Sequence, residues 1–429
     1  MKTENENKVG YKKTKLGWIP EDWEVIKFGD IFSFLKTYSY SRANLEITKN
    51  EDSVLNIHYG DIHSTYSSNI LDVSKNLHLM PSIKSPNGSY ELLMEGDLII
   101  ADASEDYEGI CTSIEIQKLN NKKLTAGLHT FAARDLKDKT TLGFRCYILR
   151  NEIVSKELKK IATGTSVYGV SKKNLSKINI PLPPLAEQRK IADILSAWDK
   201  AIETTQNLIE KLQLRKKGLM QQLLTGEKRL PGFSGQCAET TLNNFIRITL
   251  RPITKPNQPY LASGLRSHGK GIFHKPNFDP NSIAMDTLYE VKENDLVVNI
   301  TFAWEHAIAV ASLIDEGGLV SHRFPTYTFL NNKSNAQFFK YYFLQKRFKY
   351  LLSIISPGGA GRNRVMSKKD FPKLKVLAPT FKEQTAIAQI LSKADEEIEQ
   401  SQQYLETIQQ EKKGLMQQLL TGQKRVKLF

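Results

Sequence analysis

Several short motifs contain the residue types that catalytic sites use, but each lacks a part that its chemistry requires. Gly264–Lys270 (GLRSHGK) has the glycine and lysine spacing of a phosphate-binding loop, yet Gly271 stands where a Ser or Thr would hold Mg²⁺. Glu290–Lys292 (EVK) resembles the Glu-x-Lys of nucleases, but the nearest aspartate–proline pair, Asp279–Pro280, is in the reverse order. His58 and His63 are five residues apart and share neither a helix face nor a strand face. We therefore predict no catalytic group, metal site or cofactor site in this chain.

Contact with DNA is a second chemistry that the polar loops could perform. Arg and Asn carry forked donors and acceptors that match guanine and adenine edges, and Lys suits phosphate groups. Glycines beside them allow a close approach of the backbone to a ligand. The candidate DNA-contacting residues are Thr165, Ser166, Tyr168, Lys172, Lys173, Arg266, His268, Lys270, Arg362, Asn363, Arg364, Lys368 and Lys369. The alternative is that these are ordinary solvated side chains.

The composition favours a polyanionic partner. The 429 residues contain 60 Lys and Arg against 46 Asp and Glu, a net charge of +14, and neutralising phosphates releases counterions. Charge alone does not establish such a partner. The three cysteines form no CxxC pair, no segment reaches the roughly 20 apolar residues of a membrane span, and the polar N-terminus does not resemble a secretory signal. These features predict a reduced, cytoplasmic setting without a membrane partner.

The chain contains an internal repeat. Lys216–Gly226 and Lys412–Gly422 have the same sequence, KKGLMQQLLTG, at an offset of 196 residues. The match continues upstream without a gap to Ser171–Lys173 and Ser367–Lys369, and before those points the halves diverge. Such an identity inside a longer gapless alignment indicates a duplication. Each half therefore consists of a variable segment followed by a nearly constant one.

The nearly constant segments have the pattern of long helices. Ala186–Leu224 contains no proline, and its apolar residues recur in alternating steps of four and three, as in a coiled coil. Pro181–Pro184 stops any helix upstream, and Gly226 and Gly422 supply C-terminal stops. A helix of about 39 residues would be roughly 58 Å long. The predicted helix–helix interface consists of Ile191, Leu195, Trp198, Ile202, Ile209, Leu212, Leu219, Leu223, Ile387, Leu391, Ile398, Leu405, Ile408, Leu415 and Leu419.

Two such stripes in one chain are best buried against each other. Because the copies are in tandem, an antiparallel pairing would place the two variable domains at opposite ends of the helices. The alternative is that each helix packs only on its own domain, although 39 residues is far longer than a small domain usually needs.

The variable segments have a mixed α/β character, with short β-rich runs such as Asp97–Ala101 and Asp295–Ile300 between Gly, Asn and Pro turns. The fold class expected is α+β, with two α/β recognition domains separated by two long antiparallel coiled-coil helices. The expected boundaries are 1–184 for the first domain, 185–226 for the central helix, 227–380 for the second domain and 381–429 for the C-terminal helix.

The repeated segments resemble the specificity (S) subunit of Type I restriction–modification systems. The resemblance is carried by Gly17–Trp23 (GWIPEDW), Pro181–Gln188 (PLPPLAEQ), both KKGLMQQLLTG endings and Arg229–Phe233 (RLPGF). It covers nearly the whole chain. One departure is Cys237, where the second domain of the family usually opens with tryptophan.

The resemblance implies a non-catalytic subunit that reads an asymmetric, bipartite target in double-stranded DNA, one half-site per domain. It implies two methyltransferase (M) subunits, which use S-adenosylmethionine, and restriction (R) subunits, which use ATP and Mg²⁺. The long helices would then act as a ruler between the half-sites. Two alternatives stay open: a helical scaffold that binds another protein, and an enzyme that processes DNA unaided.

Overall fold

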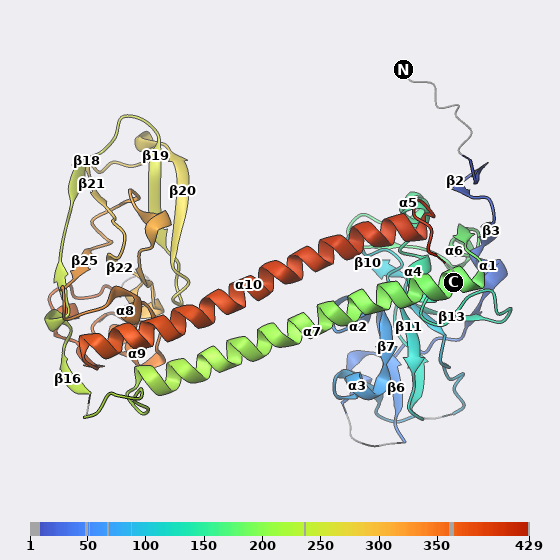
Figure 1. Ribbon diagram of the computed structural model, residues 1–429, viewed down its shortest axis with the longest axis horizontal. Helices are drawn as coiled ribbons and strands as arrows, with labels where there is room; N and C mark the ends of the chain where they lie inside the picture. Colours follow the sequence, from blue (N-terminus) through green and yellow to red (C-terminus); the bar gives the residue numbers. More distant parts are fainter. Residues whose placement is uncertain are drawn as a thin grey trace. The chain divides into compact units, whose positions relative to one another are not determined.

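The computed structural model describes residues 9–47, 50, 52–66, 68–86, 88–235, 237–359 and 364–427. The chain divides into two compact units, Met1–Asn207 with Gln403–Phe429, and Leu208–Gln402. Each unit combines one mixed α/β domain with part of both long helices, α7 (Leu185–Leu224) and α10 (Phe381–Leu420) (Figure 1). The mixed α/β class expected from the sequence is confirmed. In the described residues, no helix has a stretch that is apolar and long enough to cross a bilayer.

The first unit is built on a five-stranded sheet of order β4-β13-β9-β11-β7 and a four-stranded sheet of order β12-β6-β8-β5. The pairs β1-β2, β10-β14 and β15-β3 complete it. Its strands are β1 (Tyr11–Thr14), β2 (Gly17–Pro20), β3 (Glu24–Lys27), β4 (Phe32–Leu35), β5 (Leu45–Glu46), β6 (Val54–Ile57), β7 (Ile70–Asp72), β8 (Ser82–Ile83), β9 (Leu98–Ala101), β10 (Ala103–Ser104), β11 (Ser113–Lys118), β12 (Lys123–Ala126), β13 (Thr130–Asp135), β14 (Tyr168–Gly169) and β15 (Asn179–Leu182). Its short helices are α1 (Phe28–Ile31), α2 (Tyr59–Ser64), α3 (Val73–Asn76), α4 (Arg145–Ile148), α5 (Glu152–Ile161) and α6 (Lys172–Leu175).

The second unit has a four-stranded sheet of order β17-β25-β22-β23 and a five-stranded sheet of order β18-β21-β24-β19-β20, with the pair β16-β26. Its strands are β16 (Ala238–Thr241), β17 (Ile246–Ile248), β18 (Pro252–Thr254), β19 (Tyr260–Leu265), β20 (Ile272–Phe278), β21 (Thr287–Glu290), β22 (Leu296–Val298), β23 (Ile308–Val310), β24 (Leu319–Val320), β25 (Thr326–Phe329) and β26 (Lys375–Ala378). Two helices, α8 (Ala336–Tyr342) and α9 (Lys346–Ile354), pack in this unit.

The β-rich runs Asp97–Ala101 and Asp295–Ile300 each contain an inner strand, β9 or β22, that has the same role in its domain. Alternate residues of β9 point to opposite faces, so Leu98 and Ile100 join one apolar core and Ile99 joins another. In β22, Leu296 joins one apolar core and the next residue, Val297, joins another. The same strand thus supports two layers in both domains.

The turn before each central strand is also shared. Asp97 accepts a hydrogen bond from the Met94 backbone N–H at 2.7 Å, and Asp295 accepts one from Lys292 at 2.9 Å. Both aspartates are buried and each is paired with an arginine, Arg134 or Arg251. A buried carboxylate needs such partners because it has lost its hydration.

The two long helices run antiparallel. In the first unit Lys412 of α10 forms an ion pair with Asp199 of α7, and in the second unit Lys216 of α7 forms one with Asp395 of α10. Figure 1 shows the end of α10 beside the start of α7 at the domain that carries β11 and β13. The two lysines are 196 residues apart, and so are the two aspartates, so each half contributes one acid and one base.

All fifteen residues proposed for the helix–helix interface are buried or half-buried. Ile191, Leu195 and Leu419 lie in the core of the first unit, and Leu223, Ile387 and Leu391 lie in that of the second. The stripe therefore packs both on the opposite helix and on the adjoining domain, so the two arrangements considered for it coexist.

Each domain is attached to its helix by a buried glutamine. Gln188 donates hydrogen bonds to the carbonyl oxygens of Pro183 (2.9 Å) and Lys139 (3.0 Å) and accepts one from the Thr141 N–H (3.0 Å). Gln384 makes the equivalent three bonds, to Pro379 and Lys333 and from Asn335. The amide satisfies backbone groups of a loop that would otherwise be unpaired at the helix start.

A buried glutamate makes a second attachment, and here the two copies differ. Glu187 accepts hydrogen bonds from Trp23 Nε1 (2.9 Å) and from Arg425 (2.8 Å to Nε). Glu383 accepts from Arg229 at 2.8 Å. Cys237 approaches the glycine after α7 as Trp23 approaches the glycine after α10, so the smaller side chain occupies the tryptophan position.

Candidate nucleic-acid interface

In the second unit, the hairpin turn between β19 and β20 presents three of the candidate residues. Arg266, His268 and Lys270 are exposed on this turn. His268 and Gly269 have φ angles of +64° and +67°, and a Cβ on Gly269 would lie 2.8 Å from the Leu344 side chain. Glycine is therefore favoured at that point of the turn.

The turn is tied to the short helix η5 (Ala303–Glu305). The backbone N–H groups of His268 and Gly269 donate to the carbonyl oxygens of Glu305 (2.8 Å) and His306 (2.9 Å). Ser267 Oγ donates to the Glu305 carboxylate at 2.6 Å. The side chains of Arg266 and Lys270 are thus carried by a turn with a fixed backbone. Burial lowers the pKa of His306, which favours its neutral form here.

Arg364 reaches the same short helix from a distant part of the sequence. Its guanidinium lies 5.1 Å from the ring centroid of Trp304 and donates to the carbonyl oxygens of Ser353 (3.0 Å) and Ser356 (3.2 Å). Stacking on the ring and two carbonyl acceptors hold the guanidinium plane in place. Arg362 and Asn363 lie outside the described residues.

The remaining lysines of this loop are exposed. Lys368 Nζ donates to the His322 carbonyl oxygen at 3.0 Å, and Lys369 is exposed. Arg323 lies beside this region, is exposed and donates to Thr301 Oγ1 at 3.2 Å. The structure therefore brings the two candidate loops of the second half together around residues 299–306. Trp304 and Arg323 were not among the candidates, because no local sequence signal connects them to either loop.

In the first unit, the loop 163–169 is closed by two backbone hydrogen bonds between Thr163 and Gly169 (3.0 and 2.8 Å). Thr165 and Ser166 are exposed at its tip. Tyr168 is half-buried, and its ring lies 4.0 Å from that of Tyr107. The loop thus presents two small hydroxyl groups on a closed turn.

Lys172 and Lys173 follow on α6, and both are exposed. Ser171 caps this helix by accepting from the Asn174 N–H at 3.2 Å. Lys172 Nζ lies 5.5 Å and 5.6 Å from the ring centroids of Phe34 and Phe131. Its charge is therefore held over an aromatic surface while it still faces solvent.

A histidine–aspartate pair lies in the same domain. His129 Nδ1 is 3.3 Å from Asp102 Oδ1, and the backbone of His129 has a φ of +52°. Burial raises the pKa of Asp102, partly offset by His129. Among the residues that the structure describes, no three His, Cys, Asp or Glu side chains gather as a metal site would require.

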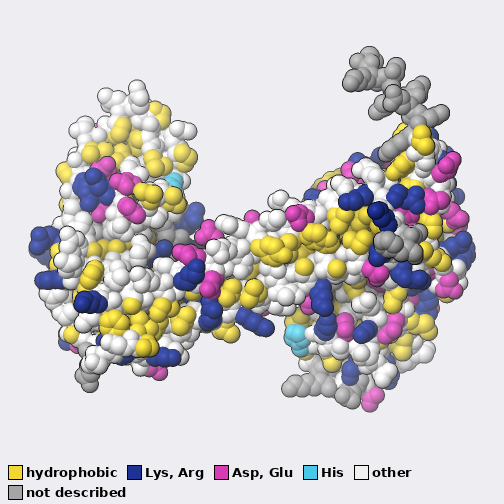
Figure 2. All heavy atoms as spheres, in the orientation of Figure 1, with side chains coloured by type: hydrophobic (Ala, Val, Ile, Leu, Met, Phe, Trp, Pro, Cys, Tyr) yellow, Lys and Arg dark blue, Asp and Glu magenta, His cyan; other side chains and the backbone are white. Residues whose placement is uncertain are grey.

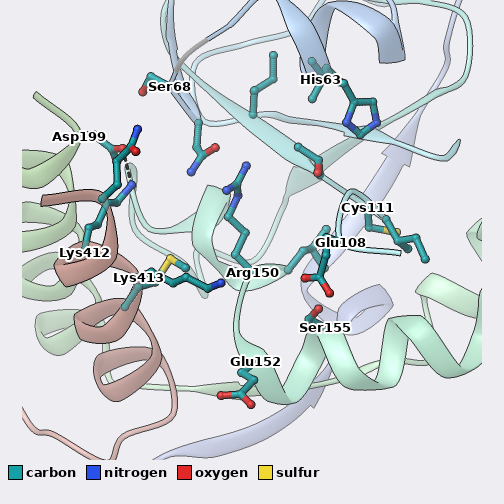
Figure 3. Close-up of a pocket in the computed structure, with 18 of the residues that line it drawn as sticks. His63, Ser68, Glu108, Cys111, Arg150, Glu152, Ser155, Asp199, Lys412 and Lys413 are labelled. Atoms are coloured by element: carbon teal, nitrogen blue, oxygen red, sulfur yellow. Dashed lines mark hydrogen bonds and ion pairs between the residues drawn. The ribbon is translucent and has the colours of Figure 1, made fainter. Parts of the chain in front are cut away.

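The first unit also contains a cavity of about 730 Å³ (Figure 3). Three of its cations are paired, Lys412 with Asp199, Lys156 with Glu152 and Lys159 with Glu108. Arg150 points into the cavity and is exposed to solvent.

The chain is similar to known proteins along most of its length. The family described as Type I restriction modification DNA specificity domain matches residues 20–214 and 249–410. A putative type I restriction enzyme MjaX specificity subunit from Methanocaldococcus jannaschii is 29% identical and aligns over 97% of both chains. The type I restriction enzyme MjaVIII specificity subunit of the same organism is 26% identical, over 95% of this chain and 94% of that one.

Two solved structures share the fold. The S subunit of a Type I restriction–modification system from M. genitalium gives a TM-score of 0.54 at 15% identity, covering 95% of this chain and 97% of that one. A chain from a study of complex assembly and conformational transition of a type I restriction–modification system gives 0.55 at 16% identity, with coverages of 95% and 99%. Both likenesses concern the whole chain and both of its domains.

Proposed function

Because this chain belongs to the Type I restriction modification DNA specificity family, we propose that it selects the DNA sequence on which a methyltransferase and a restriction subunit act. The chain itself is the non-catalytic specificity subunit. Its two globular domains each read one half-site of a bipartite target. The candidate residues for this contact are those on the 163–173 and 266–270 loops and Arg364, Lys368 and Lys369.

One observation carries the proposal: the framework is duplicated in atomic detail while the domains it holds are not. The Gln188 and Gln384 contacts, and the pairs Lys412–Asp199 and Lys216–Asp395, repeat at an offset of 196 residues. The basic loops, in contrast, differ in sequence, length and partners. A duplicated frame with two different reading surfaces fits a target of two unrelated half-sites, which is asymmetric rather than palindromic.

The partners follow from the family. Subunits of this family work with methyltransferase and restriction subunits, and this chain would bind two copies of the former and recruit the latter. S-adenosylmethionine, ATP and Mg²⁺ would be bound by those partners and not by this chain. The long helices and adjoining domain surfaces would provide the docking framework.

Methylation mapping tests the proposal. The chain is expressed with and without its presumed methyltransferase partner in a host without other DNA methyltransferases, and methylated bases are mapped over the genome. The expected result is a new, split, asymmetric motif that requires both proteins. Methylation or cleavage by this chain alone would support an autonomous enzyme. No motif from a soluble, associated pair would support a protein-binding scaffold.

A further inference from the structure

The β19–β20 hairpin has one face that the domain core does not use. Leu265 and Ile272, which pair across the hairpin, belong to an apolar core cluster. The opposite face carries Tyr260, Phe273 and Phe278, and none of these rings belongs to a core cluster of the described residues. β20 is the edge strand of its sheet, so among the described residues only β19 is hydrogen-bonded to it.

A bulge places the aromatic rings on the same face. The pairing register slips between Tyr260 and Ala262, and Asn277 on the opposite strand has a φ of +55°. As a result Lys275 lies between two rings, with Nζ 5.9 Å from the centroid of Phe273 and 5.8 Å from that of Phe278. Tyr260 contacts Phe278 edge-on at 5.6 Å.

This face continues into the turn that carries the candidate DNA-contacting residues. The Phe273 ring lies against Gly264, where a Cβ would be 2.6 Å from the ring. Glycine at this position therefore allows the ring to lie flat on the neighbouring strand. Arg266 Cζ is 5.8 Å from the same ring, so the cation at the turn and the aromatic face are in contact.

The charge of the hairpin fits a polyanion. Residues 260–278, which span the hairpin, contain three Lys and Arg, namely Arg266, Lys270 and Lys275, and neither Asp nor Glu. In Figure 2, apolar side chains are exposed over the part of the molecule where Figure 1 shows β19 and β20. Phe273 and Phe278 are half-buried and Lys275 between them is exposed. A cation held between partly accessible rings can contact a phosphate while the rings contact apolar parts of nucleotides, and a two-stranded ribbon fits the major groove of duplex DNA.

We propose that this outer face, formed by Phe273, Lys275 and Phe278, lies against duplex DNA and determines part of the half-site that the second domain reads. The inference rests on the proposed function and extends it to residues outside the candidate loops. Lys275 contacts a phosphate or a guanine edge. The Phe rings contact sugars and thymine methyl groups in the groove.

Two substitutions and one control test the inference in the complex with the methyltransferase. Lys275→Ala removes the exposed cation, and Phe278→Leu keeps an apolar side chain but removes the ring. Lys346→Ala removes another exposed lysine, from α9 of the same unit. Affinity for a duplex that carries the mapped motif is measured over a range of salt concentrations, and methylated motifs are mapped for each variant.

We expect Lys275→Ala to weaken binding by about tenfold and to reduce the salt slope by about one, whereas Lys346→Ala changes neither. Phe278→Leu is expected to relax one half-site and leave the other unchanged. The inference is overturned if Lys275→Ala behaves like Lys346→Ala, or if it releases the methyltransferase, which would make the face a protein interface. If the unaltered complex itself shows no sequence preference, the proposed function fails, a result distinct from a failure of the hairpin variants alone.

Discussion

At the scale of single residues, Glu115 of β11 has an unusual environment. It is fully buried and accepts hydrogen bonds from the backbone N–H groups of Gly143 (2.6 Å) and Cys146 (3.1 Å). Burial raises the pKa of Glu115 to about 7, because the two donors offset only part of the lost hydration. The folded-state pKa thus exceeds the unfolded value. The contribution to stability is complete below the unfolded pKa and is lost as pH rises through about 7.

We therefore expect the unfolding free energy of the first unit to fall between pH 5 and pH 8, by on the order of 3 kcal/mol. Urea unfolding in a Trp304→Phe background measures this, since Trp18, Trp23 and Trp198 all belong to the first unit. Glu115→Gln is the control: its amide does not titrate, so the fall should disappear. It should also be less stable at pH 5, because the amide nitrogen cannot accept from a backbone N–H. An unchanged pH dependence in this variant would exclude Glu115 as the cause.

At the scale of elements, the two antiparallel ion pairs are related by the repeat but differ in exposure. The side chains of Lys412 and Asp199 are 13% and 14% exposed, and those of Lys216 and Asp395 are 22% and 41% exposed. In both units a tyrosine, Tyr147 or Tyr341, donates to the aspartate (2.6 and 2.7 Å). Removal of the lysine should cost more where the remaining aspartate is less accessible to water.

Lys412→Met is therefore expected to destabilise the helix pairing of the first unit by about 3 kcal/mol, and Lys216→Met that of the second by about 1 kcal/mol or less. Hydrogen exchange of residues 403–420 and 208–224, each in its own variant, measures the difference. The double variant Asp199→Asn with Lys412→Met should recover most of the loss, because no charge is left unpaired. If the two single variants lost the same protection from hydrogen exchange, the burial of an ion pair would not determine how much it stabilises the helix pairing.

The elements that the sequence could predict are those whose signals are local. The stripe from Ile191 to Leu223 and the glycine after it predict one long helix, and α7 runs from Leu185 to Leu224. The contacts of Arg364 with Trp304, and of Lys275 with two rings, could not be foreseen. They depend on a backbone bulge at Asn277 and on a short helix some 60 residues before Arg364, and neither leaves a periodic pattern.

The candidate site was predictable only in part for the same reason. Glycines and cations mark Arg266 and Lys270 in the sequence, because a tight turn requires glycine and exposed loops tolerate charge. Nothing local shows that this turn meets the loop of Arg364 at η5. β20 has the composition of an ordinary half-buried strand, so the sequence alone does not show that Phe273 and Phe278 lie outside the core clusters.

At the scale of the whole molecule, the duplication separates two properties that a DNA-reading subunit needs. The repeated contacts of Gln188, Gln384 and the two ion pairs define a frame that is independent of the loops. The loops and the β19–β20 face are carried by the domains and can differ without altering that frame. The spacing of a bipartite target would then belong to the helices and the identity of its bases to the domains.

This separation predicts the effect of lengthening the helices. Insertion of four residues into both α7 and α10, after Asn207 and before Gln403, where the chain passes from one unit to the other, adds about 6 Å to each helix. At about 3.4 Å per base pair, the gap between half-sites should lengthen by one or two base pairs, while both half-sites stay the same. Methylation mapping of the variant with its partner measures the gap directly.

Insertion into α7 alone is the control. It shifts Asp199 relative to Lys412 or Lys216 relative to Asp395, and it should abolish methylation. An unchanged gap in the double insertion would mean that the helices do not set the spacing, and that the DNA bends or the domains swing to meet their half-sites.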